Sequence, residues 1–228
     1  SMYEQGSSTN MIEKFLYQPV TPFFLTQGFG EDRACVSLTD DKTVISKESS
    51  ATCPTGYRSL YSQTKGHNGL DLRAKRWEPV YAAHDGIVTE VQTEEARGLG
   101  VGIVSDEQRY FEEAGKKCHY KTRYWHFIAL DVHYGEKVKT GDFIGHADST
   151  GFSSGDHLHF ELKPVTIIDD ENGVPVYNNT LQNNGMLGAV NPLPYMEMES
   201  ALAVAGLVRS IKEFTARLAD YLADKLRV

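Results

Sequence analysis

Apolar and polar residues alternate over short runs through much of this chain, and glycine-containing turns separate the runs. Successive side chains of a strand point to opposite faces, whereas the apolar residues of a helix recur every three or four positions. No helix-length period occurs among these runs, so the sequence predicts an antiparallel all-β architecture. The runs that carry this prediction are residues 79–83, 86–91, 101–104, 121–130 and 157–162.

The β region is expected to span residues 15–196, after a polar and flexible N-terminal segment, residues 1–14. Two stretches inside it, near 31–65 and 166–188, are polar and have no sustained period. Long loops without secondary structure are uncommon in compact domains and are often functional. We therefore expect two irregular insertions at these places.

Residues 197–228 have a different character and predict a C-terminal amphipathic helix. Their apolar residues lie alternately three and four positions apart, and five basic residues balance five acidic ones. Such a helix packs on its own domain, self-associates or docks a partner, and the sequence leaves these alternatives open. The apolar stripe consists of Val204, Leu207, Ile211, Phe214, Leu218 and Tyr221.

Charge and hydropathy exclude several classes of protein. The chain has 23 basic and 31 acidic residues, a net charge of −8, which argues against a general attraction to nucleic acid or an anionic membrane. The longest apolar run, residues 201–208, is far shorter than the ~18 residues of a membrane span. Residues 1–10 lack the features of a secretory signal. Because the Ser1–Met2 start resembles a cloning remnant, this does not place the protein in the cytoplasm.

The three cysteines do not form a disulfide scaffold, because their number is odd and the chain is of medium length. Cys35 and Cys53 flank a polar stretch and could close a loop in an oxidising compartment, which would leave Cys118 free. Three reduced thiols fit the sequence equally well, so the disulfide state stays open.

Three segments hold histidines and a carboxylate in patterns that suit a metal centre. In a strand, His157 and His159 project from one face about 7 Å apart, which suits a metal ligand beside a proton donor. His67 and Asp71 are four positions apart, a spacing that can bring an imidazole and a carboxylate to one centre, and Gly69 lets the backbone pass close. The three segments are residues 66–71, 124–126 and 155–161.

Two imidazoles and one carboxylate leave a zinc ion with an open position for water. Zinc lowers the pKa of that water and polarises a carbonyl oxygen, and a nearby histidine can move protons at neutral pH. Each motif alone is a weak signal, because H-x-x-x-D and H-x-H often occur as surface or packed residues. Their joint occurrence in a β context favours a zinc-dependent hydrolase.

The segment from Gly28 to Tyr195 resembles the LytM/lysostaphin-type zinc metallopeptidases, the M23 family. The resemblance extends over about three quarters of the chain and includes both expected insertions. The matching motifs are Gly28-Phe29-Gly30, His67-x-x-x-Asp71, residues 79–88, Tyr124-Trp125-His126-Phe127, residues 138–145, residues 149–162 and residues 190–195.

This resemblance implies a role for each of five residues. His67, Asp71 and His159 correspond to the zinc ligands of the family. His126 and His157 correspond to its pair of catalytic histidines, which activate water, stabilise the oxyanion and pass a proton to the leaving amine. The family fold is a pair of antiparallel β-sheets that form an open groove, and the usual substrates are peptide cross-links of bacterial peptidoglycan.

The chain departs from the family pattern beside the proposed site. Asp156 stands where a proline is usual, directly before His157, and its carboxylate would favour a protonated imidazole if the two groups met. Trp125 is bulkier than the residue frequent at its position. Strand alternation predicts that it faces away from His126, which would share a face with Tyr124 and Ile128. Tyr61 matches only weakly the tyrosine that often precedes the first ligand of the family.

These features together predict a zinc metalloendopeptidase that hydrolyses peptide cross-links or stem peptides of peptidoglycan. The alternatives are a degenerate module that binds cell wall or regulates another hydrolase, and a wall hydrolase carried on a phage particle. The expected location is the cell envelope, meaning the periplasm, or a secreted or virion-associated state. The scissile bond stays open, and we expect ordinary structural roles for the other four histidines, His84, His119, His133 and His146.

Overall fold

The computed structural model describes residues 12–31, 64–151, 153 and 155–198, together with the backbone of three short strands between residues 35 and 59. The chain divides into two compact units, Ser1–Met196 and Glu197–Val228. The predicted helix of residues 197–228 lies outside the described residues from residue 199 onward, and its expected first residue, Glu197, instead ends strand β16 (Met196–Glu197). Tyr61, the side chains of Cys35 and Cys53, and most of the segments 1–14 and 31–65 also lie outside the described residues.

The described residues form strands and two short 3-10 helices, so the predicted all-β class is confirmed for this part of the chain. The first strands are β1 (Leu16–Tyr17), β2 (Leu25–Gln27), β3 (Cys35–Ser37), β4 (Ile45–Ser46), β5 (Tyr57–Ser59), β6 (Leu70–Arg73), β7 (Pro79–Tyr81) and β8 (Gly86–Glu94). They are followed by β9 (Gly98–Ser105), β10 (Arg109–Phe111), the 3-10 helix η1 (Glu112–Ala114), β11 (Lys116–Leu130), β12 (Lys137–Val138) and β13 (Phe143–Ala147). The last elements are β14 (His157–Asp169), β15 (Pro175–Asn179), the 3-10 helix η2 (Leu193–Tyr195) and β16 (Met196–Glu197).

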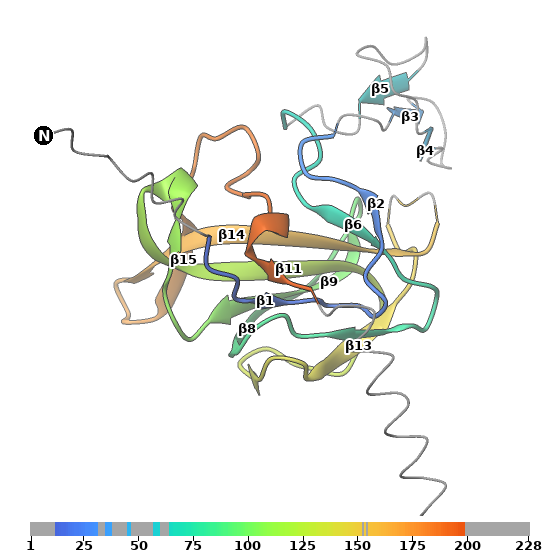
Figure 1. Cartoon of the computed structure of the whole chain (residues 1–228). Coiled ribbons are helices and arrows are strands. Elements are labelled where there is room, and N and C mark those ends of the chain that lie inside the picture. The colour runs from blue at the N-terminus through green and yellow to red at the C-terminus, as the bar shows by residue number, and fades with distance from the viewer. Residues whose placement is uncertain are drawn as a thin grey trace, which may run out of the picture. The chain divides into compact units, whose positions relative to one another are not determined.

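One large sheet carries most of these strands (Figure 1). Its main path runs β12-β8-β9-β11-β14-β6-β2, and β7, β10, β13 and β15 pair beside this path. The registers in this sheet are antiparallel, as the sequence predicts. Two smaller sheets consist of β1 with β16 and of β3 with β4 and β5.

The long strand β11 changes its neighbour halfway along its length. From His119 to Trp125 it pairs with β14, and from Phe127 to Leu130 it pairs with β13. His126 lies between these two halves with a φ angle of 69°, and the register with β9 also shifts there. A bulge of this kind bends a strand and changes the direction of its side chains.

The main core lies on one face of the β11–β14 pair. Tyr124 and Phe160 are fully buried opposite each other, with ring centroids 5.2 Å apart. The hydroxyl of Tyr124 accepts a hydrogen bond from the backbone N–H of Ala83, which ties the segment after β7 to the core. Burying such apolar surface is the main favourable term in folding. Leu70, Leu72, Ile103, Leu158 and Leu162 belong to the same cluster of buried hydrophobic residues as these two rings.

A second group of aromatic rings holds the start of the described chain. The ring of Phe15 lies 4.7 Å from that of Tyr120, 5.2 Å from that of Tyr195 and 5.8 Å from that of Phe111. The backbone N–H of Phe15 also donates to the carbonyl of Tyr195. These contacts join the beginning and the end of the β region.

The insertion predicted near residues 166–188 is partly regular, which corrects the expectation of an irregular loop. Strand β14 continues to Asp169 and pairs with β15 as a hairpin. The carboxylate of Asp170 accepts hydrogen bonds from the backbone N–H groups of Asn172 and Val174, and Gly173 has a φ angle of 76°. The turn chemistry and the β-branched residues beside it favour a hairpin over a loop.

Within the described residues we find no helix long and apolar enough to cross a membrane.

His84 is a buried structural histidine, as expected of the residues outside the motifs. Its Nδ1–H donates to the carbonyl of Asp85 at 2.8 Å, and its Nε2 lies 2.8 Å from Oγ1 of Thr122. The ring packs against Tyr120 at 4.7 Å. Burial lowers the pKa of His84 from 6.5 to about 4, so the folded protein holds this ring neutral.

His84 makes the stability of the fold sensitive to acid. The unfolded chain binds a proton at His84 near pH 6.5 and the folded protein only near pH 4, so the stabilisation by the neutral ring is lost as the pH falls between these values. We expect His84→Gln to reduce the loss of unfolding free energy between pH 7 and pH 5 by about 2 kcal/mol. Urea unfolding at the two pH values measures this difference.

His133→Gln is the matched control, because the side chain of His133 is 83% exposed and pairs with Glu136 at the surface. This variant should keep the acid dependence of the wild type. Equal losses of stability in the wild type and in His84→Gln would contradict the assignment of His84.

Candidate active site

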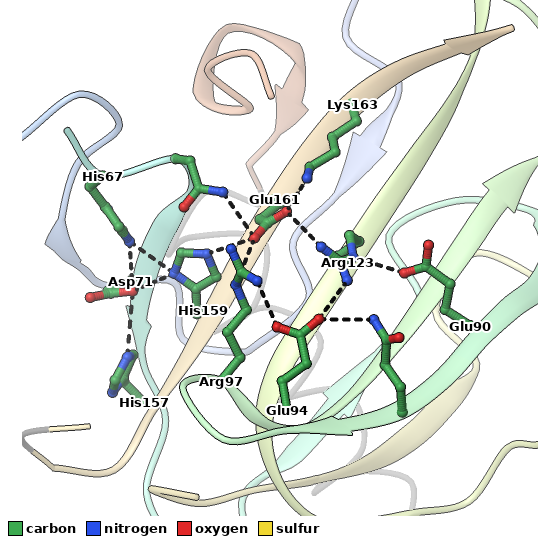
Figure 2. A network of polar contacts seen from close by, with 12 residues as sticks. His67, Asp71, Glu90, Glu94, Arg97, Arg123, His157, His159, Glu161 and Lys163 are labelled. Atoms are coloured by element: carbon green, nitrogen blue, oxygen red, sulfur yellow. Dashed lines mark hydrogen bonds and ion pairs between the residues drawn. The ribbon is translucent and has the colours of Figure 1, made fainter. Parts of the chain in front are cut away.

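Three of the predicted residues meet at one point on the large sheet. His159 on β14 lies directly opposite Asp71 on β6, and His67 precedes β6 by three residues. Nε2 of His67 is 2.9 Å from Nδ1 of His159 and 3.1 Å from Oδ1 of Asp71, and Nδ1 of His159 is 3.0 Å from the same oxygen. Figure 2 shows the two imidazoles directed at the carboxylate. All three side chains are buried.

Gly69 makes this approach of the two strands possible. A Cβ atom at Gly69 would lie 2.6 Å from the carbonyl oxygen of Phe160 and 2.9 Å from Cε1 and Nε2 of His159. Such distances are too short for carbon atoms, so any side chain here would displace β14 or the His159 ring. The sequence predicts this role for Gly69, and the structure confirms it.

Hydrogen bonds fix which nitrogen of each ring faces the centre. Nδ1–H of His67 donates to the carbonyl of Gly28 at 3.1 Å, which leaves the Nε2 lone pair for the centre. Nε2–H of His159 donates to Oε1 of Glu161 at 3.3 Å, which leaves its Nδ1 lone pair for the centre. Two imidazole lone pairs and a carboxylate oxygen therefore converge, and acceptors this close require a proton or a cation between them.

The charges around the centre favour a cation there. Burial raises the pKa of Asp71, but hydrogen bonds from His157, His159 and His67 outweigh it and hold this pKa well below its ordinary value. Burial lowers the pKa of His159, but the hydrogen bonds to Asp71 and Glu161 outweigh it and raise this pKa. His67, Asp71 and His159 have the geometry of a metal site, with ligand atoms all within 4.8 Å of one another.

The other two predicted histidines lie beside this centre. The ring of His126 is 4.5 Å from that of His157 and 6.2 Å from that of His159. Nδ1–H of His126 donates to the carbonyl of Thr150 at 2.6 Å, and burial, together with the neighbouring histidines, lowers the pKa of His126 to about 3. His126 is therefore neutral at pH 7, with its proton on Nδ1 and its lone pair on Nε2.

His157 is held in a similar way at the start of β14. Its Nδ1–H donates to the carbonyl of Gly155 at 2.7 Å, and Nε2 lies 3.5 Å from Oδ1 of Asp71. The carboxylate that contacts His157 is thus Asp71. Oδ2 of Asp156 instead accepts a hydrogen bond from the backbone N–H of Arg76.

The predicted facing of β11 is wrong at His126. Tyr124 packs in the core, whereas His126 lies with His157 and His159 on the opposite face. Trp125 lies directly opposite His159 in the register of β11 with β14, so it shares the site face instead of pointing away from it. The bulge at His126, where the backbone takes a left-handed conformation, breaks the alternation of side chains.

A buried group of charges that the sequence motifs do not predict adjoins the centre (Figure 2). Glu161 is fully buried and contacts Lys163 at 3.0 Å and both Arg97 and Arg123 at 3.6 Å. Asn68 donates a further hydrogen bond to this carboxylate. Glu161 thus connects the metal-type centre to three cations.

A pattern in the sequence could have found this group. His157, His159, Glu161 and Lys163 stand two positions apart, as do Lys121, Arg123 and Trp125, so each set shares one strand face. Charged residues in register within a buried strand are rare unless they pair with one another. The two strands do pair, with Arg123 opposite Glu161 and Lys121 opposite Lys163.

A column of three glycines on β9 leaves room for these side chains. Gly98, Gly100 and Gly102 stand two positions apart and face Thr150, Trp125 and Glu90 respectively. A Cβ atom at Gly100 would lie 2.1 Å from Cε3 of Trp125. The Trp125 ring instead lies over the backbone of β9, with the guanidinium of Arg123 at 4.5 Å from its centroid.

The remaining histidines make ordinary contacts. Nδ1–H of His119 donates to the carbonyl of Ser105, and Nδ1–H of His146 donates to the carbonyl of Trp77. His133 pairs with Glu136 at the surface. Cys118 is buried and free.

Part of the chain is similar in sequence to known peptidases. Residues 65–176 match the model of Peptidase family M23. The peptidoglycan DD-endopeptidase ShyA of Vibrio cholerae is 34% identical over 108 residues, which are 46% of this chain and 23% of ShyA. The glycyl-glycine endopeptidase ALE-1 of Staphylococcus capitis is 31% identical over 132 residues, which are 58% of this chain and 29% of ALE-1.

Solved structures include a zinc-containing peptidase from Vibrio cholerae, which is 27% identical with a TM-score of 0.47 over 79% of this chain and 41% of that one. The chain spans about a quarter of the length of the curated relatives it matches. The matched segment contains all five predicted site residues. The chain belongs to peptidase family M23.

Proposed function

We propose that this protein is a zinc metalloendopeptidase that hydrolyses peptide cross-links or stem peptides of bacterial peptidoglycan. The observation that carries the proposal is the convergence of His67, Asp71 and His159, with His126 and His157 beside them. The names of two relatives, a peptidoglycan DD-endopeptidase and a glycyl-glycine endopeptidase, support peptide hydrolysis of cell wall.

The donor set fits zinc. His67 would bind through Nε2, His159 through Nδ1 and Asp71 through Oδ1, because these atoms converge and their partner atoms are already hydrogen-bonded. Nitrogen and carboxylate ligands suit zinc, and catalytic zinc sites have three protein ligands and an open position. When bound there, zinc supplies a Lewis acid for the scissile carbonyl and a water of lowered pKa.

His126 and His157 are placed to handle protons and the oxyanion. Each ring donates its Nδ1–H to a backbone carbonyl, that of Thr150 or of Gly155, and Nε2 of His157 lies 3.5 Å from Oδ1 of Asp71 at the centre. Nε2 of a neutral imidazole can accept a proton from water and later donate it to the leaving amine. We assign these steps to the pair, because both rings lie beside Asp71 and His159.

Glu161 is a positioning residue in this proposal. Its hydrogen bond to Nε2–H of His159 sets the tautomer that directs Nδ1 to the metal. Such carboxylate partners orient a histidine ligand and raise its basicity. Arg97, Arg123 and Lys163 compensate the buried charge of Glu161 and fix it in place.

We further propose that residues 15–196 are the peptidase domain, with the site in an open groove between β-sheets, and that residues 197–228 are a separate helix for self-association or partner docking. Action on peptidoglycan implies a place in the cell envelope, outside the cell or on a virion. The arrangement of the described site gives no reason to prefer a degenerate module, because all five polar groups converge there.

His67→Ala tests the metal and the reaction together. Loss of one of three ligands should abolish zinc binding and lower hydrolysis roughly 10³-fold, because a bound metal contributes several kcal/mol to transition-state stabilisation. Elemental analysis gives the zinc content, and mass spectrometry of fragments released from purified peptidoglycan gives the hydrolysis and the bond cut. His133→Ala, which changes an exposed histidine, should retain both.

Zinc-free wild-type protein that still cuts peptides would overturn the proposal. Wild-type protein that binds peptidoglycan but holds no zinc and cuts nothing would instead identify a wall-binding module.

His157→Ala separates a catalytic histidine from a ligand. The three proposed ligands remain, so zinc content should stay at the wild-type level while kcat falls roughly 10²- to 10⁴-fold, the contribution of a positioned acid or base. Metal analysis and steady-state kinetics on the same preparation make the comparison. A parallel loss of zinc would make His157 a ligand and contradict this assignment.

Glu161→Gln tests the positioning role by metal affinity. We expect zinc to bind about 10- to 100-fold more weakly, as for other lost partners of a ligating histidine. Competition with a chromophoric chelator measures the affinity, and a urea unfolding curve checks the fold, since the cations lose a buried partner. Glu94→Gln is the control, because Glu94 belongs to the same charge group and no contact links it to His159. Equal affinities for Glu161→Gln and the wild type would remove Glu161 from the site.

A further inference from the structure

A polar cavity of about 250 Å³ lies on the same sheet as the proposed metal centre. Its floor consists of Glu90 from β8, Lys121 and Arg123 from β11, and Lys163 from β14, and the end of β15 lines the cavity as well. Lys163 follows His159 by four residues on one strand face, which places it about 13 Å along β14 from the metal ligand. The cavity and the centre therefore belong to one continuous surface.

The cavity has more positive than negative charge. Three cations and one carboxylate line it. These four residues form one network of ion pairs with Arg97, Glu94 and Glu161. The whole charge group has four positive and three negative side chains. An anion of single charge would balance the group.

Two lysines in the cavity keep donors that no protein group uses. Nζ of Lys121 donates to Oε1 of Glu90, and Nζ of Lys163 forms an ion pair with Oε2 of Glu161 at 3.0 Å. An ammonium group has three N–H donors, so two remain on each lysine. Both side chains are largely buried, at 7% and 5% exposure, and within the described residues neither makes another hydrogen bond.

The buried cations lack full compensation. Burial lowers the pKa of Lys163 against the attraction of Glu161, and the positive charge of Arg123 lowers it further. Ion pairs in a partly buried cavity are screened by salt much less than pairs at the surface. A carboxylate that accepts from Lys121 and Lys163 would replace the missing hydration of both groups.

We propose that this cavity is a subsite for a carboxylate of the substrate peptide, about four residues from the scissile bond. An extended chain covers roughly 3.3 to 3.6 Å per residue, so about four residues bridge the distance from the centre. The proposal rests on the proposed peptidase function and adds a substrate class, a peptide with a free carboxylate on one side of the cleaved bond. The carboxylate oxygens accept from Lys121 and Lys163, and the side chains of β15 bound the site.

A pair of substrates that differ only in charge tests the subsite. Cross-linked peptide dimers from purified peptidoglycan are used in their native form and after conversion of their free carboxyl groups to methylamides. For the wild type we expect kcat/KM to fall about tenfold on amidation, the value of a charge-assisted hydrogen bond. The buffer anions are the same in both assays. A lower kcat/KM for the amidated substrate therefore shows that the carboxylate in the subsite belongs to the peptide.

Variants assign the preference to the cavity. Lys121→Gln removes one donor and contacts no proposed ligand, and it should reduce the tenfold ratio to about twofold or less. Asn178→Asp places a negative charge on the half-buried end of β15 and should reduce the ratio without loss of a buried partner. Lys117→Gln removes the same charge from an exposed position of β11 and should keep the ratio of the wild type.

Equal rates for the two substrates in the wild type would overturn the subsite, as would a ratio that both cavity variants leave unchanged. Equilibrium binding of the same pair by calorimetry gives the charge preference even if no bond is cut. Failure to cut either substrate therefore counts against the proposed function, whereas loss of the charge preference in binding counts against the subsite.

Discussion

The bulge of β11 at His126 is the constraint on which the arrangement of the site depends. Before it, β11 pairs with β14 and supplies Arg123 and Trp125 to the face that carries His159. After it, the strand pairs with β13. A regular strand would have placed His126 in the core beside Tyr124, and the left-handed conformation returns it to the face of the other histidines.

Buried charged residues lie beside the bulge on the paired strands β11 and β14. Glu161 is fully buried, and an isolated carboxylate there would be strongly disfavoured, so its contacts with Arg97, Arg123 and Lys163 are necessary for the fold as well as for His159. Two of these cations, Arg123 and Lys163, also line the cavity that β15 bounds. The carboxylate of Glu161 thus contacts both His159 and the cations that line the cavity.

The sequence predicts the all-β class from its periods of two, whereas the meeting of five site residues is implied by the resemblance to family M23. His157 and His159 share a face in any strand, and Asp71 follows His67 at a fixed short distance. The facing of His126 does not follow, because no residue near it signals a positive φ angle. The hairpin of β14 and β15 does not follow from the lack of a sustained period in residues 166–188, although the β-branched residues beside its turn favour strands.

The three glycines of β9 tolerate substitution less well than the residues on the strands around them. Gly98, Gly100 and Gly102 supply backbone hydrogen bonds but no side chains, and their neighbours occupy the space that a Cβ atom would need. Substitutions that reshape the cavity must therefore be made on the strands that line it, for example at Glu90 or Asn178, while the glycines of β9 are left unchanged.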